Sequence, residues 1–304
     1  MPDGFGSRKH LSKWIWKSGR LPDGKQTMNG PIHSKEETMN RKPAGKMTAL
    51  ALVLGALVLI AVRAPATAAP ITLTYANFPP ASTFPCVQME RWSREVEKRT
   101  NGQVKINTFP GGTLLAAKNI FDGVISGTAD IGNFAMSYQP GRFPVSEAAD
   151  LPLGLPNARV ASLVLTDLIE KHQPKEFEKV KILTLFTCPP ADFMTSKPVR
   201  TLKDLKGMEL RVSGTGVDVV KNLGGIPIAM PQSETPEAIQ KGIVKGIVSS
   251  MEVLKDMNYA AYCPFATDTN LFVVSFAVVM NRDKWNALPD AVKKAMDDLR
   301  AEQA

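Results

Sequence analysis

The chain has 304 residues, a formal net charge of +8, and only three histidines and three cysteines. A chain this basic would ordinarily suggest nucleic acid or an anionic membrane surface as a partner. The basic excess, however, lies in the first 68 residues, and the formal charge of residues 69–304 is about +1. We therefore expect no nucleic-acid partner.

An apolar run from Met47 to Val62 follows three basic residues and ends near Ala66-Thr67-Ala68. A basic segment, an apolar core shorter than the roughly 20 residues of a membrane span, and an Ala-x-Ala site are typical of a secretory signal peptide. We expect residues 39–68 to be this signal peptide, with cleavage after Ala68. An uncleaved anchor is the alternative, since Arg63 flanks the run. Residues 1–38 fit no part of a signal peptide, and we expect a non-native or disordered extension upstream of a start at Met39.

The cysteines, Cys86, Cys188 and Cys263, are odd in number and widely spaced. At most one disulfide can form, and the spacing matches neither a zinc site nor a Cys-x-x-Cys motif, so buried free thiols are favoured. After the leader, His172 is the only histidine, which argues against histidine-based metal sites and against catalytic triads. We expect no cofactor and no metal.

Beyond the leader, short segments rich in β-forming residues alternate with helical patterns. This alternation predicts an α/β fold with a mostly parallel sheet or sheets. The strands are expected at residues 71–76, 104–109, 131–135, 181–187, 208–212, 226–230, 247–250 and 270–280. The helices are expected from about 85 to 100, then at 116–126, 158–171, 217–223 and 234–241, and from Pro289 to the chain end.

Two blocks, residues 120–132 and 239–250, share a helix, a glycine that ends it and a short strand. A chance match is one interpretation. The other is a pair of similar α/β lobes whose strand ends meet at a common cleft, where open α/β sheets bind ligands.

Arg211 lies at the end of a short apolar strand, before a turn of Gly, Ser and Thr residues that opens a helix. A guanidinium is always charged and binds a carboxylate through two parallel hydrogen bonds, so this position suits a small organic anion. A surface arginine, or one paired with a structural acid, is the alternative. A dinucleotide site is disfavoured because Val219 stands where the third glycine of the fingerprint belongs.

Five further residues are candidates for ligand contact, each with a structural alternative. Phe78 lies in an aromatic and proline-rich loop that could cover an apolar ligand or pack in the core. Asn133 and Met136 follow the strand of the first repeated block, and Ser249 and Met251 follow that of the second. These side chains could contact a ligand or cap the next element.

Taken together, the motifs resemble the extracytoplasmic substrate-binding proteins of tripartite ATP-independent periplasmic (TRAP) transporters. The matching elements run in family order: residues 127–132, residues 140–144 with Asp150-Leu-Pro152, residues 205–212 with Arg211, residues 224–227 and residues 280–289. None is specific alone, but the ordered set spans nearly all of residues 70–300.

The resemblance implies a two-lobed periplasmic-binding-protein-like fold, with hinge strands between the lobes and a ligand cleft at their interface. We expect residues 69–190 to form mainly the first lobe, 191–280 mainly the second with the hinge crossings, and 281–304 a truncated C-terminal helix. In the family the arginine at the position of Arg211 grips the substrate carboxylate. A monomeric receptor in the periplasm, which delivers a small organic acid to the large and small TRAP membrane subunits, is implied.

Two departures from the family bear on the ligand. Some members carry a second arginine where Ala191 stands and an amide near Ser249, and here both residues are small. A monocarboxylate with an apolar body is therefore favoured over a dicarboxylate. The rival functions are an exported sensor or scavenger without a transporter and, less favoured, an enzyme, for which no acid-base or nucleophile cluster is evident.

Overall fold

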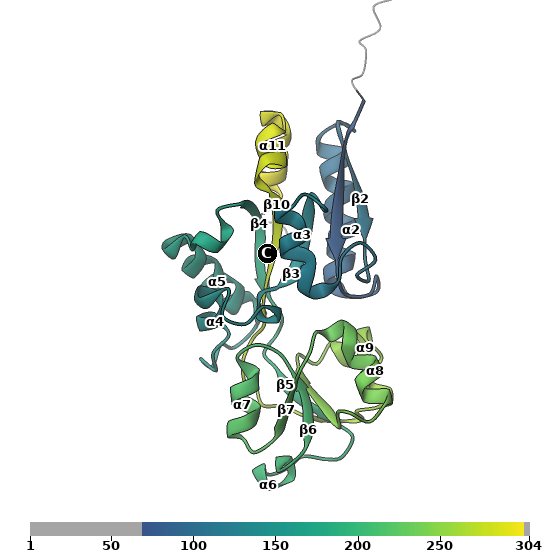
Figure 1. The fold of residues 1–304 in the computed structure, drawn as a ribbon, viewed down its shortest axis with the longest axis vertical. Helices are drawn as coiled ribbons and strands as arrows, with labels where there is room; N and C mark the ends of the chain where they lie inside the picture. The colour runs from purple at the N-terminus through teal and green to yellow at the C-terminus, as the bar shows by residue number, and fades with distance from the viewer. Residues whose placement is uncertain (1–68, 301–304) are drawn as a thin grey trace, which may run out of the picture. The chain divides into compact units, whose positions relative to one another are not determined.

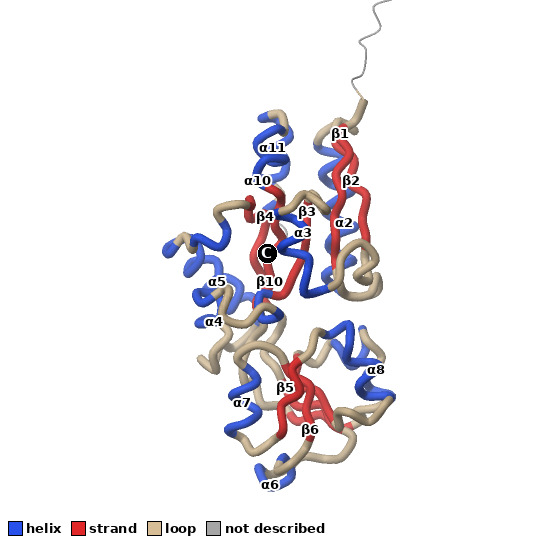
Figure 2. Tube along the Cα trace, viewed as in Figure 1, coloured by secondary structure: helices blue, strands red, loops and turns tan. Residues whose placement is uncertain are grey.

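A computed structural model describes residues 69–300, and the signal-peptide prediction lies outside this range. Two five-stranded sheets form separate lobes, each flanked by helices, as Figures 1 and 2 show. The predicted two-lobed α/β class is confirmed.

The helices and strands of the first lobe are β1 (Ile71–Asn77), α2 (Phe84–Arg99), β2 (Val104–Phe109), η1 (Ala117–Asn119), α3 (Ile120–Ile125), β3 (Ile131–Ala135), η2 (Met136–Tyr138), α4 (Pro144–Ala149), α5 (Ala158–His172), η3 (Lys175–Phe177), β4 (Val180–Thr187), β10 (Ser275–Asn281), α10 (Arg282–Ala287) and α11 (Asp290–Asp298).

The second lobe is built from the segment between β4 and β10. Its elements are β5 (Asp192–Thr195), α6 (Leu202–Leu205), β6 (Glu209–Val212), α7 (Gly216–Asn222), β7 (Ile226–Ala229), η4 (Gln232–Glu234), α8 (Thr235–Gln240), β8 (Gly246–Ser249), α9 (Val253–Asp256), η5 (Tyr259–Ala261) and β9 (Phe265–Thr267).

The two sheets share one topology. Their strand orders are β2-β1-β3-β10-β4 and β7-β6-β8-β5-β9, and in each the first three strands are parallel while the last two pairings are antiparallel. The repeated blocks found in the sequence correspond to α3–β3 and α8–β8, at equivalent places in the two sheets. The expectation of a mostly parallel sheet holds for strand direction, because four strands of each sheet run the same way and only β10 in the first sheet and β5 in the second run against them.

The first sheet is buried on both faces. Residues of β1 alternate, so Leu73 and Tyr75 pack towards α2 and α11, while Ala76 packs on the opposite side with α3 and α5. Helix α2 begins with Pro85 in its first turn and ends at Lys98 and Arg99, which suits the helix dipole.

Two chain segments connect the lobes, residues 188–191 and residues 268–274. They hydrogen-bond to each other: the Cys188 N–H donates to the Val274 carbonyl at 3.2 Å, and the Ala191 N–H to the Phe272 carbonyl at 2.7 Å. The predicted strand at 270–280 is therefore a crossing followed by β10. Because β10 returns to the first sheet, the segment assigned mainly to the second lobe ends in the first.

Candidate ligand-binding site

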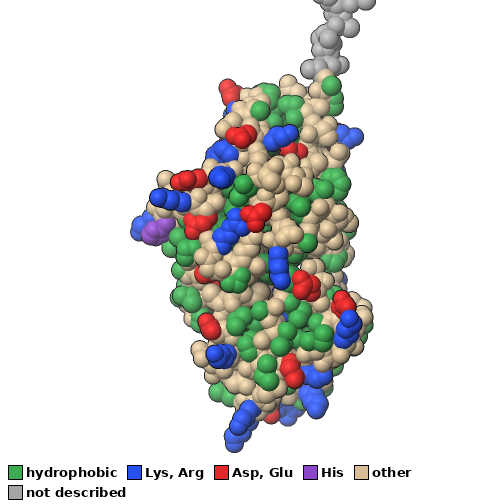
Figure 3. Space-filling view, in the orientation of Figure 1, with side chains coloured by type: hydrophobic (Ala, Val, Ile, Leu, Met, Phe, Trp, Pro, Cys, Tyr) green, Lys and Arg blue, Asp and Glu red, His purple; other side chains and the backbone are tan. Residues whose placement is uncertain are grey.

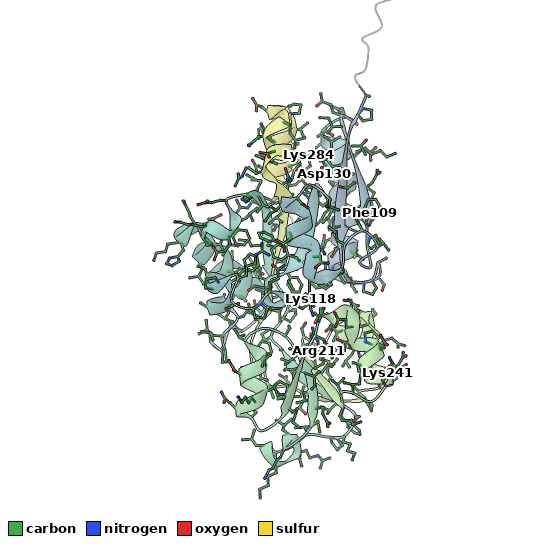
Figure 4. The ribbon with its side chains drawn as sticks, in the orientation of Figure 1. Phe109, Lys118, Asp130, Arg211, Lys241 and Lys284 are labelled. Carbon is green, nitrogen blue, oxygen red and sulfur yellow. The ribbon has the colours of Figure 1, made fainter. Side chains whose placement is uncertain are left out.

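Arg211 is the centre of the candidate site. Strand β6 pairs with β7 and β8, which places Arg211 opposite Ile228 and Ile247 inside the second sheet. Its side chain is 3% exposed. Figure 4 shows it on the side of the second lobe that faces the first, below Lys118 in this view. The residue that the sequence placed at a strand end is therefore buried, and the alternative of a surface arginine does not apply.

The guanidinium is held by one main-chain carbonyl. Nε and Nη2 of Arg211 donate to the carbonyl of Met230, at 3.0 and 2.7 Å. Met230 is fixed in turn, because its N–H donates to the Val212 carbonyl at 3.3 Å. These bonds orient the side chain through Nε and Nη2, and a further side-chain hydrogen bond joins Arg211 to Tyr138. A guanidinium has five N–H groups, so donors remain for a ligand.

No carboxylate of the described residues forms an ion pair with Arg211. Burial of an unpaired charge is costly, and natural proteins almost always pair such a charge. The guanidinium has a carbonyl and the neutral Tyr138 hydroxyl as its partners. A bound anion would supply the negative charge that neither of them carries.

Arg211 opens into a cavity of about 70 Å³ between the two lobes. One wall is aromatic: the ring of Phe78 stacks on that of Phe276 with centroids 6.3 Å apart, and Phe276 stacks on Phe186 at 5.0 Å. Tyr138 packs edge-on against Phe78 at 5.3 Å. This wall suits the apolar body of a ligand whose charged end meets Arg211.

The other charged residues of the cavity are acidic. Glu252 and Asp256 line it, and Arg211 is the one basic residue among the lining side chains that the structure describes. Burial raises the pKa of the Glu252 carboxyl, while a hydrogen bond from Ser250 opposes that rise. The cavity therefore offers one cation for one carboxylate, with acids elsewhere.

Contacts between the lobes surround the cavity. The main-chain N–H of Gln232 donates to the Tyr138 hydroxyl at 3.0 Å, and the Thr215 hydroxyl donates to the Asp150 carbonyl at 2.8 Å. Gly214 has φ +56°, and a Cβ there would lie 2.6 Å from the Cβ of Ser137 in the first lobe. The turn after β6 can approach the first lobe this closely because Gly214 has no side chain.

The structure brings three of the six predicted residues together, since Phe78, Arg211 and Ser249 line this cavity. Asn133 does not; it lines an adjoining cavity of about 510 Å³ over the first sheet and donates to the Asn77 side chain at 2.9 Å. Met136 is 0% exposed in the core of the first lobe, where η2 turns its side chain inward. Met251 is not among the residues that line either cavity.

Sequence reasoning missed Tyr138, Gln232, Glu252 and Phe276, which also line the cavity. Glu252 stands next to the proposed Met251, and the turn into α9 presents Glu252 instead. Phe276 lies in a strand that reads as ordinary core. Nothing in the sequence around Gln232, in the loop after β7, indicates ligand contact. Its place in the cavity is evident only when the structure brings it next to Tyr138 of the first lobe.

The rest of the described chain adds few chemical groups. All three cysteines are free, with Cys86 and Cys263 buried and Cys188 half-buried beside the cavity. No group of three or more His, Cys, Asp or Glu side chains within residues 69–300 is arranged to hold a metal ion. Nor does any helix in that range have the length and apolarity needed to cross a bilayer. On the face drawn in Figure 3, acidic and basic side chains are interspersed.

Known structures share this architecture. A TRAP periplasmic solute-binding protein from Desulfovibrio salexigens is 56% identical, with a TM-score of 0.67 over 77% of this chain and 74% of that one; it was solved as an open complex with the C-terminus of a symmetry mate in its ligand-binding site. A TRAP periplasmic solute-binding protein from Bordetella bronchiseptica, with bound (R)- and (S)-mandelate, is 29% identical, with a TM-score of 0.71 over 76% of this chain and 75% of that one.

Among curated proteins, the outer membrane transporter protein TsaT of Comamonas testosteroni is 28% identical over 221 residues, which cover 69% of this chain. The chain spans 64% of the length of that relative. The model of the bacterial extracellular solute-binding protein family 7 matches residues 75–304. The chain therefore belongs to this family, the solute-binding proteins of TRAP transporters, which are receptors rather than enzymes.

Proposed function

We propose that this protein is the extracytoplasmic receptor of a TRAP transporter and that it captures a small monocarboxylate at Arg211 by closure of its two lobes. The observation that carries the proposal is the buried Arg211 guanidinium, which has a carbonyl partner and no acid. A ligand carboxylate would accept from this guanidinium and supply the missing negative charge.

The relatives support a carboxylate. The C-terminus seated in the ligand-binding site of the Desulfovibrio salexigens protein carries a carboxylate, and the Bordetella bronchiseptica protein holds mandelate, which pairs a carboxylate with an aromatic ring. In this chain the ring would pack on Phe78 and Phe276, which form the aromatic wall.

The charges of the cavity favour a single carboxylate. Ala191 provides no second cation, and a second carboxylate on the ligand would lie near Glu252 and Asp256. Like charges at close range repel by about 1 kcal/mol or more, even in a solvated setting. A dicarboxylate is thus disfavoured both by the missing arginine and by the acids that are present.

Lobe movement follows from the size of the site. Ligand pockets usually enclose roughly 300–1,000 Å³, whereas this cavity holds about 70 Å³ and is bridged by contacts between the lobes. Ligand therefore enters with the lobes apart, and its contacts to both lobes stabilise the closed state. Export to the periplasm and delivery to the membrane subunits for ion-gradient-driven uptake complete the proposal.

A thermal-shift screen tests the carboxylate role of Arg211. We expect benzoate, (R)-mandelate or pyroglutamate to raise the melting temperature, because binding to the folded state adds RT ln(1 + [L]/Kd) of stability. In Arg211→Ala the affinity should fall by at least about 100-fold, which corresponds to about 2.8 kcal/mol. Arg200→Ala, at an exposed arginine of the same lobe, is the matched control and should bind normally. Wild-type affinity in Arg211→Ala would refute the proposal.

A further inference from the structure

Gln232 carries a polar side chain that no protein group satisfies. Its side chain is buried, with 9% of the residue exposed, and neither Oε1 nor Nε2 has a hydrogen-bond partner in the described part of the chain. Buried amides are almost always hydrogen-bonded, because an unpartnered one has lost its hydrogen bonds to water without replacing them. An amide in this state suggests a partner that arrives with the ligand.

The backbone of Gln232 is fixed from both sides. Its N–H donates to the Tyr138 hydroxyl of the first lobe at 3.0 Å, and its carbonyl accepts from the Tyr259 hydroxyl at 3.1 Å. Pro231 precedes it with φ −60° and ψ 156°. The position of the side chain is therefore set by the main chain and does not depend on a partner for the amide.

The amide lies beside the carboxylate anchor. Arg211 donates to the carbonyl of Met230, two residues before Gln232, and both Arg211 and Gln232 line the same cavity. In a cavity of about 70 Å³, a carboxylate held by Arg211 would place the substituent on its α-carbon within reach of the amide. Because both ends of the amide are unpartnered, either Oε1 or Nε2 can turn towards the ligand.

We infer that Gln232 selects carboxylates with a hydrogen-bonding heteroatom on the α-carbon, such as 2-hydroxy acids and acids with an α-amide N–H. The inference rests on the proposed function and narrows its ligand class. A hydroxyl or an amide N–H donates to Oε1, and Nε2 can donate to the carboxylate or to the hydroxyl. An acid with an unsubstituted α-carbon would leave the amide unpartnered, and sites built to bond such a group reject ligands that lack it.

The test compares pairs of acids that differ only in the substituent on the α-carbon: (R)- and (S)-mandelate against phenylacetate, and pyroglutamate against 3-oxocyclopentanecarboxylate. Calorimetric titration of the wild type should give at least tenfold tighter binding to one enantiomer of mandelate, or to pyroglutamate, than to its partner. In Gln232→Leu, which keeps both main-chain bonds, this ratio should fall to within about twofold of one. Gln240→Leu, at an exposed glutamine of α8, should keep the wild-type ratio.

A second readout separates ligand selection from a structural role. The ligand-free Gln232→Leu protein should melt at the wild-type temperature or about 2–4 °C above it, because an unpartnered amide is removed. A lower melting temperature would assign the amide to the fold and overturn the inference. Equal affinity within each pair, or discrimination retained in Gln232→Leu, would overturn it while leaving the receptor role intact. Binding of none of these acids would contradict the proposed function, and the inference would fall with it.

Discussion

Arg211 and the two acids beside it have opposite effects on an anionic ligand: Arg211 attracts a carboxylate, and the acids repel one. Arg211 is buried beside a carbonyl and is ready to pair with an anion, whereas Glu252 and Asp256 place negative charge in the same cavity. Under the proposed function, this arrangement would admit one carboxylate and discourage two. The selectivity would then depend on residues that repel as well as on the one that attracts.

Replacement of Glu252 tests this exclusion. In Glu252→Gln the repulsion of a second carboxylate is removed, so the affinity for succinate relative to propionate should rise by about tenfold. Glu237→Gln removes an exposed acid of α8 and serves as the control. Competition binding against a monocarboxylate measures both ratios. An unchanged ratio in Glu252→Gln would show that Glu252 takes no part in selection.

Asp150 should make stability depend on pH. It is 2% exposed, and burial raises its pKa from 3.8 to about 7, although a hydrogen bond from the Ser275 hydroxyl opposes the rise. Between these values the folded protein binds more protons than the unfolded chain, so the contribution of Asp150 is greatest below pH 4 and is lost as the pH rises to about 7. The slope is at most about 1.4 kcal/mol per pH unit.

In Asp150→Asn this contribution should disappear. Urea unfolding of both proteins at a series of pH values gives the difference in their free energies of unfolding, which should change in favour of the variant between pH 4 and 7 and stay level above pH 7. Parallel pH profiles for the two proteins would contradict the assignment of this dependence to Asp150.

The turn after β6, the strand that carries Arg211, contacts the first lobe at Ser137. Gly214 combines a left-handed backbone with a close approach to Ser137, so an added methyl group would strain the turn and push against the other lobe. Gly207, in the turn before β6, has φ +76° with nothing within 4 Å of an added Cβ. The two glycines share the backbone requirement and differ only in the contact.

Alanine at these two positions separates strain from closure. Gly214→Ala and Gly207→Ala should each lose about 1–2 kcal/mol of stability, because both place alanine in the left-handed region. Ligand affinity should fall by at least tenfold in Gly214→Ala alone. Urea unfolding and calorimetric titration of both variants measure the two effects, and equal affinity losses would show that the contact with Ser137 does not govern closure.

Local patterns predicted the main elements and pointed to Arg211 as a candidate for ligand binding. Strands such as β1 and β6 were evident because alternation and apolar runs reflect burial directly, and Arg211 was evident because a permanent charge at a strand end needs a partner. Strand β9, with three residues, is too short to leave a pattern, and β5 was missed although it is as long as β6. Strand β10 is antiparallel to its neighbours because the chain comes back from the second lobe into the first sheet. Nothing in the local sequence indicates this path.

The cavity was predicted only in part for the same reason. Phe78 follows the end of β1 and Ser249 is the last residue of β8. Because strand ends of α/β sheets gather at one edge, their position in one cavity with Arg211 was foreseeable. Met136 follows a strand end as well, but η2 folds its side chain into the core. Gln232 becomes a candidate only when its burial and its missing partners are known.

The two lobes together make a receptor whose site is assembled from both. The first lobe provides the aromatic wall of Phe78 and Phe276, the second provides Arg211, and the crossing segments beside Cys188 and Val274 connect them. Under the proposed function, the ligand contacts both lobes, and these contacts stabilise the closed arrangement.

A crystal structure of the protein with the carboxylate that gives the largest thermal shift tests this account most directly. We expect both lobes to contact the ligand, with its carboxylate accepting from the Arg211 guanidinium at about 2.7–2.9 Å and its apolar body against Phe78 and Phe276. A ligand bound away from Arg211, or held by one lobe only, would contradict the account.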